Sequence, residues 1–504
     1  MRFVITHRKG AVALRRLRAA AAVGGLALAG GACSTGDVAE LNGPTEDQYT
    51  TISDRSQLQA LATGLLDGDR STYATEVVFF SIIGRDLYRI DPAESRYITN
   101  LLSNSLTDNS NFVGGGLFNA PYRTIRGADL LINAVSSSTA ISPTNLTAPE
   151  KSAINGFART VKALQYIHLI RARDTVGVAI QTNADAVVPI RCEPAVLAYV
   201  GSLLDSAATD LRAAGSTPFP FNLPTGFAGF TTPDAPSGQD FLQFNRGLKG
   251  IVQMYRGFLP LRTSNSPETA PNNVLLDSAL TALGESAIRP TRSRAELDLG
   301  VYYVFGTGSG ETLNPLVDLS VFRVNPKVIT QGAEPGDVRI QAKVDTVSGG
   351  AIALRGISSK YLVKYPGTAT DRLALLKNSE LLLTRAQVLW GLRRDAEALA
   401  IVNDVRAAAG LPARTLADFP AYTGVQGDAR SARVNLLVNG ILKEKRYELL
   451  FESPVRWVDF RTMGVLRELG TESISGVVRQ PLRAFPITNN EVVARGGAAS
   501  AVCQ

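Results

Sequence analysis

Residues 441–466 of this 504-residue chain combine many charged side chains with aromatic residues and one proline. Glu444, Glu448 and Glu452 follow one another at intervals of four, so an α-helix would place all three on one stripe of its surface. Pro454 must break that helix, because proline lacks the backbone N–H and its ring clashes with the preceding turn. The charged residues after the break are Arg456, Asp459 and Arg461. The run therefore predicts a helix that ends at a highly charged corner.

A hydrolytic site and an ion-pair network are the two interpretations of this acidic stripe. Two carboxylates can hydrolyse a glycosidic bond when they lie about 5–5.5 Å or about 6.5–9.5 Å apart, and helix neighbours can meet either spacing. However, the acids have cations close in sequence, namely Lys445, Arg446, Arg456 and Arg461. An opposite charge lowers the pKa of a carboxyl group, which is the wrong direction for a general acid. We therefore predict no catalytic residue here, and a structural salt-bridge motif formed by Glu444, Glu448, Glu452, Arg456, Asp459 and Arg461.

The first 32 residues are typical of a lipoprotein signal peptide. A basic segment precedes an apolar stretch at residues 19–29, which is too short to span a bilayer core. Small residues lead into Cys33, as lipoprotein processing requires, so we predict that Cys33 is lipidated. The alternative is an ordinary secretory signal in which Cys33 has no role. Residues 33–46 are polar and predict a short tether.

Removal of this leader changes the interpretation of the charge. The formal net charge of +7 includes six basic residues of the leader, and 46 Lys and Arg then remain against 45 Asp and Glu. A nearly neutral chain without a basic block interleaved with aromatics does not indicate nucleic-acid binding.

The remaining cysteines and histidine indicate structural roles. Cys192 and Cys503 form an even pair in an oxidising compartment, so a disulfide is expected, with two unpaired thiols as the alternative. His168 lies in an apolar helical pattern and is expected in the core. Without a cluster of His and Cys, neither a zinc site nor another cofactor is predicted. The sequence also lacks a Gly-x-Ser-x-Gly elbow and a phosphate loop with lysine, so an enzyme is not expected.

Helical periodicity dominates and predicts a mainly α fold of tetratricopeptide-like helical hairpins, with an irregular, loop-rich lobe and minor short strands. Thr147 and Glu150 form a capping box before one helix. Asp395 is the expected N-cap of a late helix, and Gly410 follows its end. Helices are expected at residues 55–67, 71–83, 97–106, 118–135, 148–173, 194–214, 240–259, 373–391 and 395–409. The expected divisions of the fold at 47–504 are a part at about 47–288, a loop and strand insert at about 289–370, and a C-terminal part at about 371–504.

The motif at residues 444–461 resembles the C-terminal signature of SusD/RagB-like proteins, which reads roughly Glu-Arg-x-x-Glu-Leu-x-Phe-Glu-Gly-x-Arg-Trp-x-Asp-Leu-x-Arg. The matching residues are Glu444, Glu448, Leu449, Phe451, Glu452, Arg456, Trp457, Asp459 and Arg461. Further segments resemble the family in the expected order, at residues 117–132, 163–170, 376–389, 395–411 and 485–491. The resemblance covers nearly all of the chain after the leader.

This resemblance implies an outer-membrane lipoprotein, lipid-anchored and facing the cell surface. Members of the family bind an oligomeric nutrient and partner a TonB-dependent transporter, a SusC-like barrel. We therefore expect a non-catalytic protein that binds a glycan or peptide and delivers it to such a barrel. The alternatives are a helical-repeat scaffold lipoprotein that binds periplasmic proteins, and a lipid-anchored hydrolase that uses the acidic stripe.

A nutrient site would lie on loops that display aromatic and polar groups. Two regions qualify, one at residues 85–112 and one at 302–322. The candidate ligand-binding residues are Arg85, Tyr88, Tyr97, Asn109, Phe112, Tyr302, Tyr303 and Phe305, with Phe322 close by in sequence. The alternative is that these aromatics fill the core. Both tryptophans, Trp390 and Trp457, fall in motifs that we interpret as structural, so the residues themselves do not select a glycan over a peptide.

Overall fold

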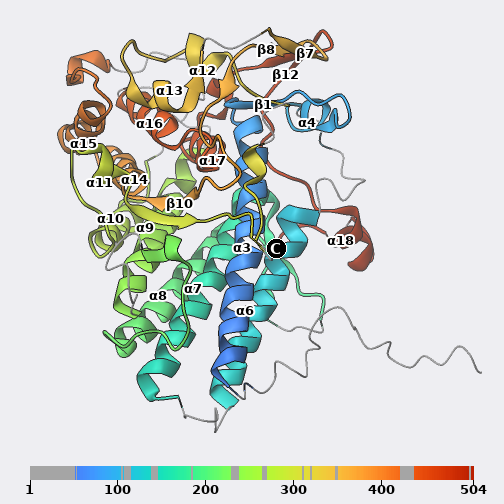
Figure 1. Cartoon of the computed structure of the whole chain (residues 1–504), viewed down its shortest axis with the longest axis vertical. Coiled ribbons are helices and arrows are strands. Elements are labelled where there is room, and N and C mark those ends of the chain that lie inside the picture. The colour runs from blue at the N-terminus through green and yellow to red at the C-terminus, as the bar shows by residue number, and fades with distance from the viewer. Residues whose placement is uncertain are drawn as a thin grey trace, which may run out of the picture. The chain divides into compact units, whose positions relative to one another are not determined.

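Long helices and short strands make up the structure, a computed structural model that confirms the mainly α fold (Figure 1). It describes residues 52–504 apart from 53, 104–105, 107–114, 138–145, 183–185, 229–237, 264–269, 309–310, 318–320, 347–349, 421–435 and 499–500. The predicted leader and Cys33 lie outside the described residues. Residues Thr51–Gln504 form one unit. Within the part described, no helix is both long and apolar enough to cross a membrane.

Successive helices pack against one another in the first half of this unit, so that α3, α6, α7 and α8 lie side by side (Figure 1). These helices are α3 (Arg55–Ile83), α6 (Ala120–Ser137), α7 (Ala148–Arg173), α8 (Glu193–Ala214), α9 (Gly238–Thr263) and α10 (Asn273–Gly284). The expected capping box at the start of α7 is present, with the Thr147 hydroxyl and the Glu150 carboxylate each bonded to the other residue's backbone N–H. A second set packs onto α9 and α10, with α14 (Asn378–Gly391), α15 (Asp395–Ala408), α16 (Leu437–Leu449) and α17 (Val455–Thr462).

The helix α3 is one continuous helix, whereas the sequence suggested a break between residues 67 and 71. Gly68 and Asp69, between positions 67 and 71, pack against neighbouring helices and do not form a turn. The Asp69 side chain is fully buried and bonded to Nε2 of His168 at 2.9 Å. A Cβ at Gly68 would lie 2.5 Å from the Thr124 hydroxyl oxygen, so glycine allows α3 and α6 to approach closely.

Other elements differ from the expectation at their ends. Residues 373–377 form a strand and not the start of a helix, because this buried run of four apolar residues and Lys377 pairs with another strand. The helix expected at 97–106 is a single turn, α4 (Arg96–Thr99), and α10 was not expected. Arg394, one residue before Asp395, is the N-cap of α15, while Gly410 lies just past its end with φ +75°.

Short antiparallel strand pairs and short helices make up the other described elements. The pairs are β1 (Leu87–Arg89) with β5 (Phe322–Val324), β2 (Val178–Ala179) with β3 (Ile190–Arg191), β4 (Gly300–Tyr303) with β10 (Leu373–Lys377), β6 (Val344–Asp345) with β9 (Leu362–Val363), β7 (Ile352–Leu354) with β8 (Ile357–Ser359), and β11 (Glu472–Ile474) with β12 (Val477–Arg479). The short helices are α11 (Arg294–Leu297), α12 (Lys327–Thr330), α13 (Val338–Lys343) and α18 (Asn489–Ala494), with the π-helix η1 (Gly115–Asn119) and the 3-10 turns η2 (Asp174–Val176), η3 (Thr225–Ala228), η4 (Pro315–Val317), η5 (Leu416–Asp418) and η6 (Leu466–Leu469).

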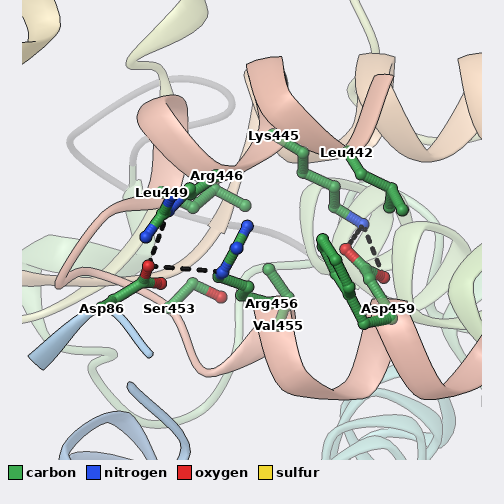
Figure 2. A pocket seen from close by; sticks show the side chains of 10 residues that line it. Asp86, Leu442, Lys445, Arg446, Leu449, Ser453, Val455, Arg456 and Asp459 are labelled. Carbon is green, nitrogen blue, oxygen red and sulfur yellow. Dashed lines mark hydrogen bonds and ion pairs between the residues drawn. The ribbon is translucent and has the colours of Figure 1, made fainter. Parts of the chain in front are cut away.

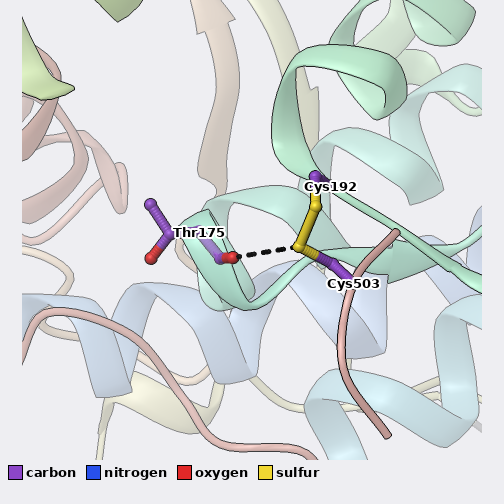
Figure 3. The surroundings of a disulfide bond; sticks show 3 residues. All are labelled: Thr175, Cys192 and Cys503. Atoms are coloured by element: carbon purple, nitrogen blue, oxygen red, sulfur yellow. Dashed lines mark hydrogen bonds between the residues drawn. A yellow bond between two sulfur atoms is a disulfide. The ribbon is translucent and has the colours of Figure 1, made fainter. Parts of the chain in front are cut away.

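Cys192 and Cys503 form a disulfide that joins the C-terminal tail to the start of α8 (Figure 3). Their Cα atoms lie 4.8 Å apart. Next to the bond, the backbone N–H of Gln504 donates to the carbonyl of Ile190 at 2.9 Å. The tail is thus fixed by one covalent bond and by backbone pairing.

Replacement of Cys192 and Cys503 by serine is expected to lower the free energy of unfolding by about 2–5 kcal/mol, because the cross-link restricts the unfolded chain. The two cysteines are 311 residues apart in sequence. Urea unfolding of the double variant beside the oxidised protein would measure the difference. Equal midpoints, together with equal resistance of the tail to protease, would contradict a stabilising role for the bond.

Candidate functional site

A cavity of about 450 Å³ opens between one face of α3, the β1–α4 segment and the chain around Phe305. We call it the aromatic cavity. Its lining residues are Asp67, Arg70, Ser71, Ala74, Thr75, Val78, Phe79, Arg89, Tyr97, Phe305, Thr312, Leu313, Pro315 and Phe322. Its volume is within the range of about 300–1,000 Å³ that is usual for small-molecule sites.

Pairing of β1 with β5 brings the two regions expected from the sequence together. Arg89 lies opposite Phe322 in this ladder. The guanidinium carbon of Arg89 lies 4.3 Å from the ring centre of Tyr97 and 5.6 Å from that of Phe322. From α3, Arg70 lies 5.7 Å from the ring centre of Phe305. Residues more than two hundred positions apart in sequence therefore form one wall.

Each arginine of this wall is held by a second contact. Arg89 forms an ion pair with Asp91 at 3.0 Å, and Arg70 donates to the carbonyl of Val304 at 3.1 Å. The cavity thus combines fixed guanidinium groups with aromatic rings and the hydroxyls of threonine and serine. Such a surface can stack against an apolar ring face and donate hydrogen bonds to hydroxyl groups.

The structure places two of the candidate ligand-binding residues, Tyr97 and Phe305, in the aromatic cavity. Asn109 and Phe112 lie outside the described residues. The sequence reasoning missed Arg70, Phe79 and Arg89. For Arg70 the overlooked signal was helical spacing, since residues 67, 70, 71, 74, 75 and 78 form one face of α3.

The remaining candidates are buried elsewhere. Arg85 has no exposed surface, and Tyr88 donates to the Glu472 carboxylate at 2.8 Å. Tyr303 donates to Asp69 in the core. Tyr302 lies on a second cavity and packs against Arg372, whose guanidinium carbon is 3.8 Å from the ring centre.

The acidic stripe takes its partners from distant parts of the chain. Glu444 pairs with Arg339 and Arg406, each at 2.7 Å, and Glu448 pairs with Arg294 and with Arg339 at 3.2 Å. The expectation that nearby cations pair with these glutamates was wrong, because those cations point to other groups. The partners instead come from α11, α13 and α15.

The break in the helix also comes earlier than expected. The helix α16 ends at Leu449, before Phe451 with its positive φ of 63°, and Pro454 lies just before α17. Glu452 therefore follows the helix, and its carboxylate pairs with Lys343 and with Lys377 at 3.3 Å.

The second half of the motif forms three further ion-pair contacts. Asp459 pairs with Lys445 at 3.0 Å, as Figure 2 shows. Arg456 lies 3.4 Å from Asp86. Arg461 lies 3.3 Å from the buried carboxylate of Asp174. The motif thus ties α16 and α17 to the first half of the chain.

Two carboxylates of the stripe, Glu448 and Glu452, also line the second cavity, of about 420 Å³. Burial acts to raise the pKa of Glu448, but its bonds with Arg294 and the charge of Arg339 lower it to about 2. Burial likewise opposes ionisation of Glu452, yet Lys343 and Lys377 hold its pKa below the ordinary value. Both groups are therefore ionised at neutral pH, and neither can donate a proton as a general acid. Across the described ranges, no group of three or more His, Cys, Asp or Glu is placed to hold a metal ion.

No protein-family model and no curated protein matches the sequence. Solved structures do match. A laminarin binding SusD-like protein is 16% identical with a TM-score of 0.56, covering 83% of this chain and 93% of that one. Surface glycan-binding protein A from Bacteroides uniformis is 15% identical with a TM-score of 0.60, covering 87% and 97%. A protein whose crystal structure was determined with a xylogluco-oligosaccharide is 14% identical with a TM-score of 0.54, covering 89% and 94%. At these identities the similarity establishes the fold.

Proposed function

Because the chain has the SusD-like fold, we propose that it is a non-catalytic lipoprotein that binds an oligosaccharide in the aromatic cavity. The observation that carries the proposal is the wall formed by Tyr97, Phe305 and Phe322 with Arg70 and Arg89. Aromatic faces beside guanidinium donors suit a sugar, which has apolar C–H faces and hydroxyl edges. Two structural neighbours are named for binding laminarin and glycan, and a third was crystallised with a xylogluco-oligosaccharide, which supports this ligand class.

The location and the partner belong to the same proposal. The leader and Cys33 support a lipid anchor, and Ser34 does not resemble the aspartate that retains lipoproteins at the inner membrane. We therefore place the protein at the outer membrane, facing the cell surface, where it would deliver its ligand to a TonB-dependent, SusC-like barrel. A mild-detergent pull-down of the native lipoprotein should recover one large β-barrel at near-equal amount. Recovery of soluble periplasmic proteins alone would contradict delivery to a transporter.

Replacement of Tyr97 and Phe305 by alanine is expected to weaken oligosaccharide binding at least tenfold, which corresponds to about 1.4 kcal/mol. The two rings lie on the cavity wall, and their loss removes the stacking surface without touching the salt-bridge motif. Isothermal titration calorimetry with laminarin and xyloglucan fragments, followed by other glycans, would measure the affinity.

The matched control is Tyr199→Ala on α8. The Tyr199 ring is half-buried against Tyr166, with ring centres 5.4 Å apart, and is not part of the cavity lining. Its affinity for the glycan should equal that of the unchanged protein. If a glycan binds the unchanged protein, the control and the cavity variant with equal affinity, the glycan site lies outside the aromatic cavity. If the protein binds oligopeptides and no glycan, the proposed ligand class is wrong.

A further inference from the structure

A third cavity, of about 240 Å³, is lined by five cationic side chains and lies apart from the aromatic cavity. We call it the basic cavity. Arg85 and Arg446 are buried, whereas Arg456, Lys327 and Lys443 are partly exposed, at 14%, 23% and 31% of their side-chain surface. Glu468 is the acidic residue on its lining.

Each paired carboxylate around the basic cavity lies close to more than one cation. Asp86 pairs with both Arg446, at 2.7 Å, and Arg456, at 3.4 Å, as the two dashed lines from its carboxylate in Figure 2 mark. Glu472 is shared by Lys327, at 2.9 Å, and Arg85, at 3.9 Å.

The remaining lysine, Lys443, shares the Glu334 carboxylate with Arg406 and Arg414, at distances of 2.6, 2.8 and 3.0 Å respectively. Arg406 also pairs with Glu444, and Arg414 also pairs with Asp418. The five cations on the cavity lining therefore have four described carboxylates, namely Glu468 on the lining and Asp86, Glu472 and Glu334 beside it, so one positive charge is in excess.

Arg85 shows this excess most directly. It has no exposed surface, and its backbone is held at φ +63°. Among the residues described, no group accepts a hydrogen bond from its Nε or Nη1 atoms. The Glu472 carboxylate is 3.9 Å from Nε, which is too far for a hydrogen bond. The Nη2 atom donates to the carbonyl of Leu102 at 3.3 Å. Buried donors normally have partners, so the Nε and Nη1 atoms are free to donate to an acceptor in the cavity.

Arg446 and Arg456, which share Asp86, also indicate that the cavity can accept a negative charge. Burial, and then the like charge of Arg446, lower the pKa of Arg456 below its ordinary value. An added negative charge in the cavity would relieve this repulsion and pair with donors that now lack a full partner.

We propose that the basic cavity binds a compact anion through a carboxylate or a phosphate group. Its volume of about 240 Å³ is many times the roughly 10–15 Å³ that one water needs, so it has room for a small anion with part of its hydration shell. The inference does not depend on oligosaccharide binding, because the basic and aromatic cavities have no lining residue in common.

Calorimetric titration of the mature protein with inorganic phosphate and with citrate, at constant ionic strength, tests the proposal. We expect saturable one-to-one binding of at least one of them, weakened at least tenfold by the double substitution Lys327→Gln and Lys443→Gln. Binding of phosphate alone would assign the site to a phosphate group, and binding of citrate alone would assign it to carboxylates. The control Lys151→Gln, a half-buried lysine on α7 outside the cavity, should bind as the unchanged protein does.

Crystals soaked in selenate provide a second readout that needs no variant. Anomalous scattering within the basic cavity would support the proposal even if the double variant fails to fold. The absence of saturable heat with both anions would overturn it. Binding that survives the folded double variant unchanged would overturn it as well.

Discussion

Glu448→Ala is expected to lower the free energy of unfolding by about 3–5 kcal/mol, or to prevent folding altogether. The Glu448 side chain is fully buried and pairs with Arg294 and Arg339. Arg339 is itself buried, at 2% of its side-chain surface exposed. Removal of the carboxylate takes one counter-charge from each guanidinium group, although Arg339 keeps Glu444 and Arg294 keeps Asp298. Breaking a buried ion pair by removing one partner is costly.

Urea unfolding monitored by tryptophan fluorescence would measure this loss, since Trp390 and Trp457 are both buried in the folded protein. The control is Glu285→Ala, which breaks the exposed pair of Glu285 with Arg212, whose side chains are 43% and 50% exposed. An exposed pair contributes about 0–1 kcal/mol, so the control should remain close to the unchanged protein. Equal effects of the two substitutions would show that the motif does not stabilise the fold.

Local signals in the sequence predicted the elements that depend on neighbouring residues. The capping box of Thr147 and Glu150 determines the start of α7 through bonds three residues apart. The helical hairpin of α14 and α15 follows from periodicity and a short turn. The strand β10 was mistaken for helix because a short, buried and mainly apolar run has the same appearance in either structure.

Long-range pairing is what the sequence could not supply. The four-residue spacing of Glu444 and Glu448 predicts that they share a face, but not which cations reach that face. Arg339 and Arg406 are 105 and 38 residues from Glu444. Their positions depend on how α13 and α15 pack onto α16, and no periodicity in the chain encodes that arrangement.

The aromatic cavity shows the same limit. The sequence identified the two segments that contribute Tyr97 and Phe305, because aromatics in loop-rich regions are typical of binding surfaces. The sequence could not show which of Tyr302 and Tyr303 lies in the core. Adjacent side chains of a strand point to opposite faces, but the sequence of this short strand does not indicate which face is buried. In β4, Tyr303 faces Asp69 in the core and Tyr302 faces the second cavity.

The buried histidine of α7 gives the second large expected effect, on the pH dependence of stability. His168 contacts Glu76 through Nδ1 at 2.7 Å and Asp69 through Nε2 at 2.9 Å. Burial acts to lower the pKa of His168, but the carboxylates of Glu76 and Asp69 outweigh it and raise the pKa from 6.5 to about 9. At neutral pH the ring is therefore a cation that donates two hydrogen bonds to two buried acids.

Because the pKa of His168 is higher in the folded protein than in the unfolded chain, protonation of His168 stabilises the fold. This contribution to the free energy of unfolding is complete below the unfolded pKa of 6.5 and is lost as the pH rises through the folded pKa of about 9. The difference corresponds to roughly 3 kcal/mol. We expect the free energy of unfolding to fall by that amount more between pH 6 and pH 10 in the unchanged protein than in His168→Gln. His168 is the one histidine after the predicted leader, so no second imidazole contributes to the difference.

Urea titrations at intervals across this pH range would give both curves. The variant should start lower at pH 6, because Asp69 and Glu76 then lack their cation, and the two curves should converge near pH 10. Lysines and tyrosines that titrate at high pH are present in both proteins, so their contributions cancel in the comparison. Parallel curves would mean that His168 keeps the same charge at pH 6 and pH 10, which would contradict a pKa of about 9 for His168 in the folded protein.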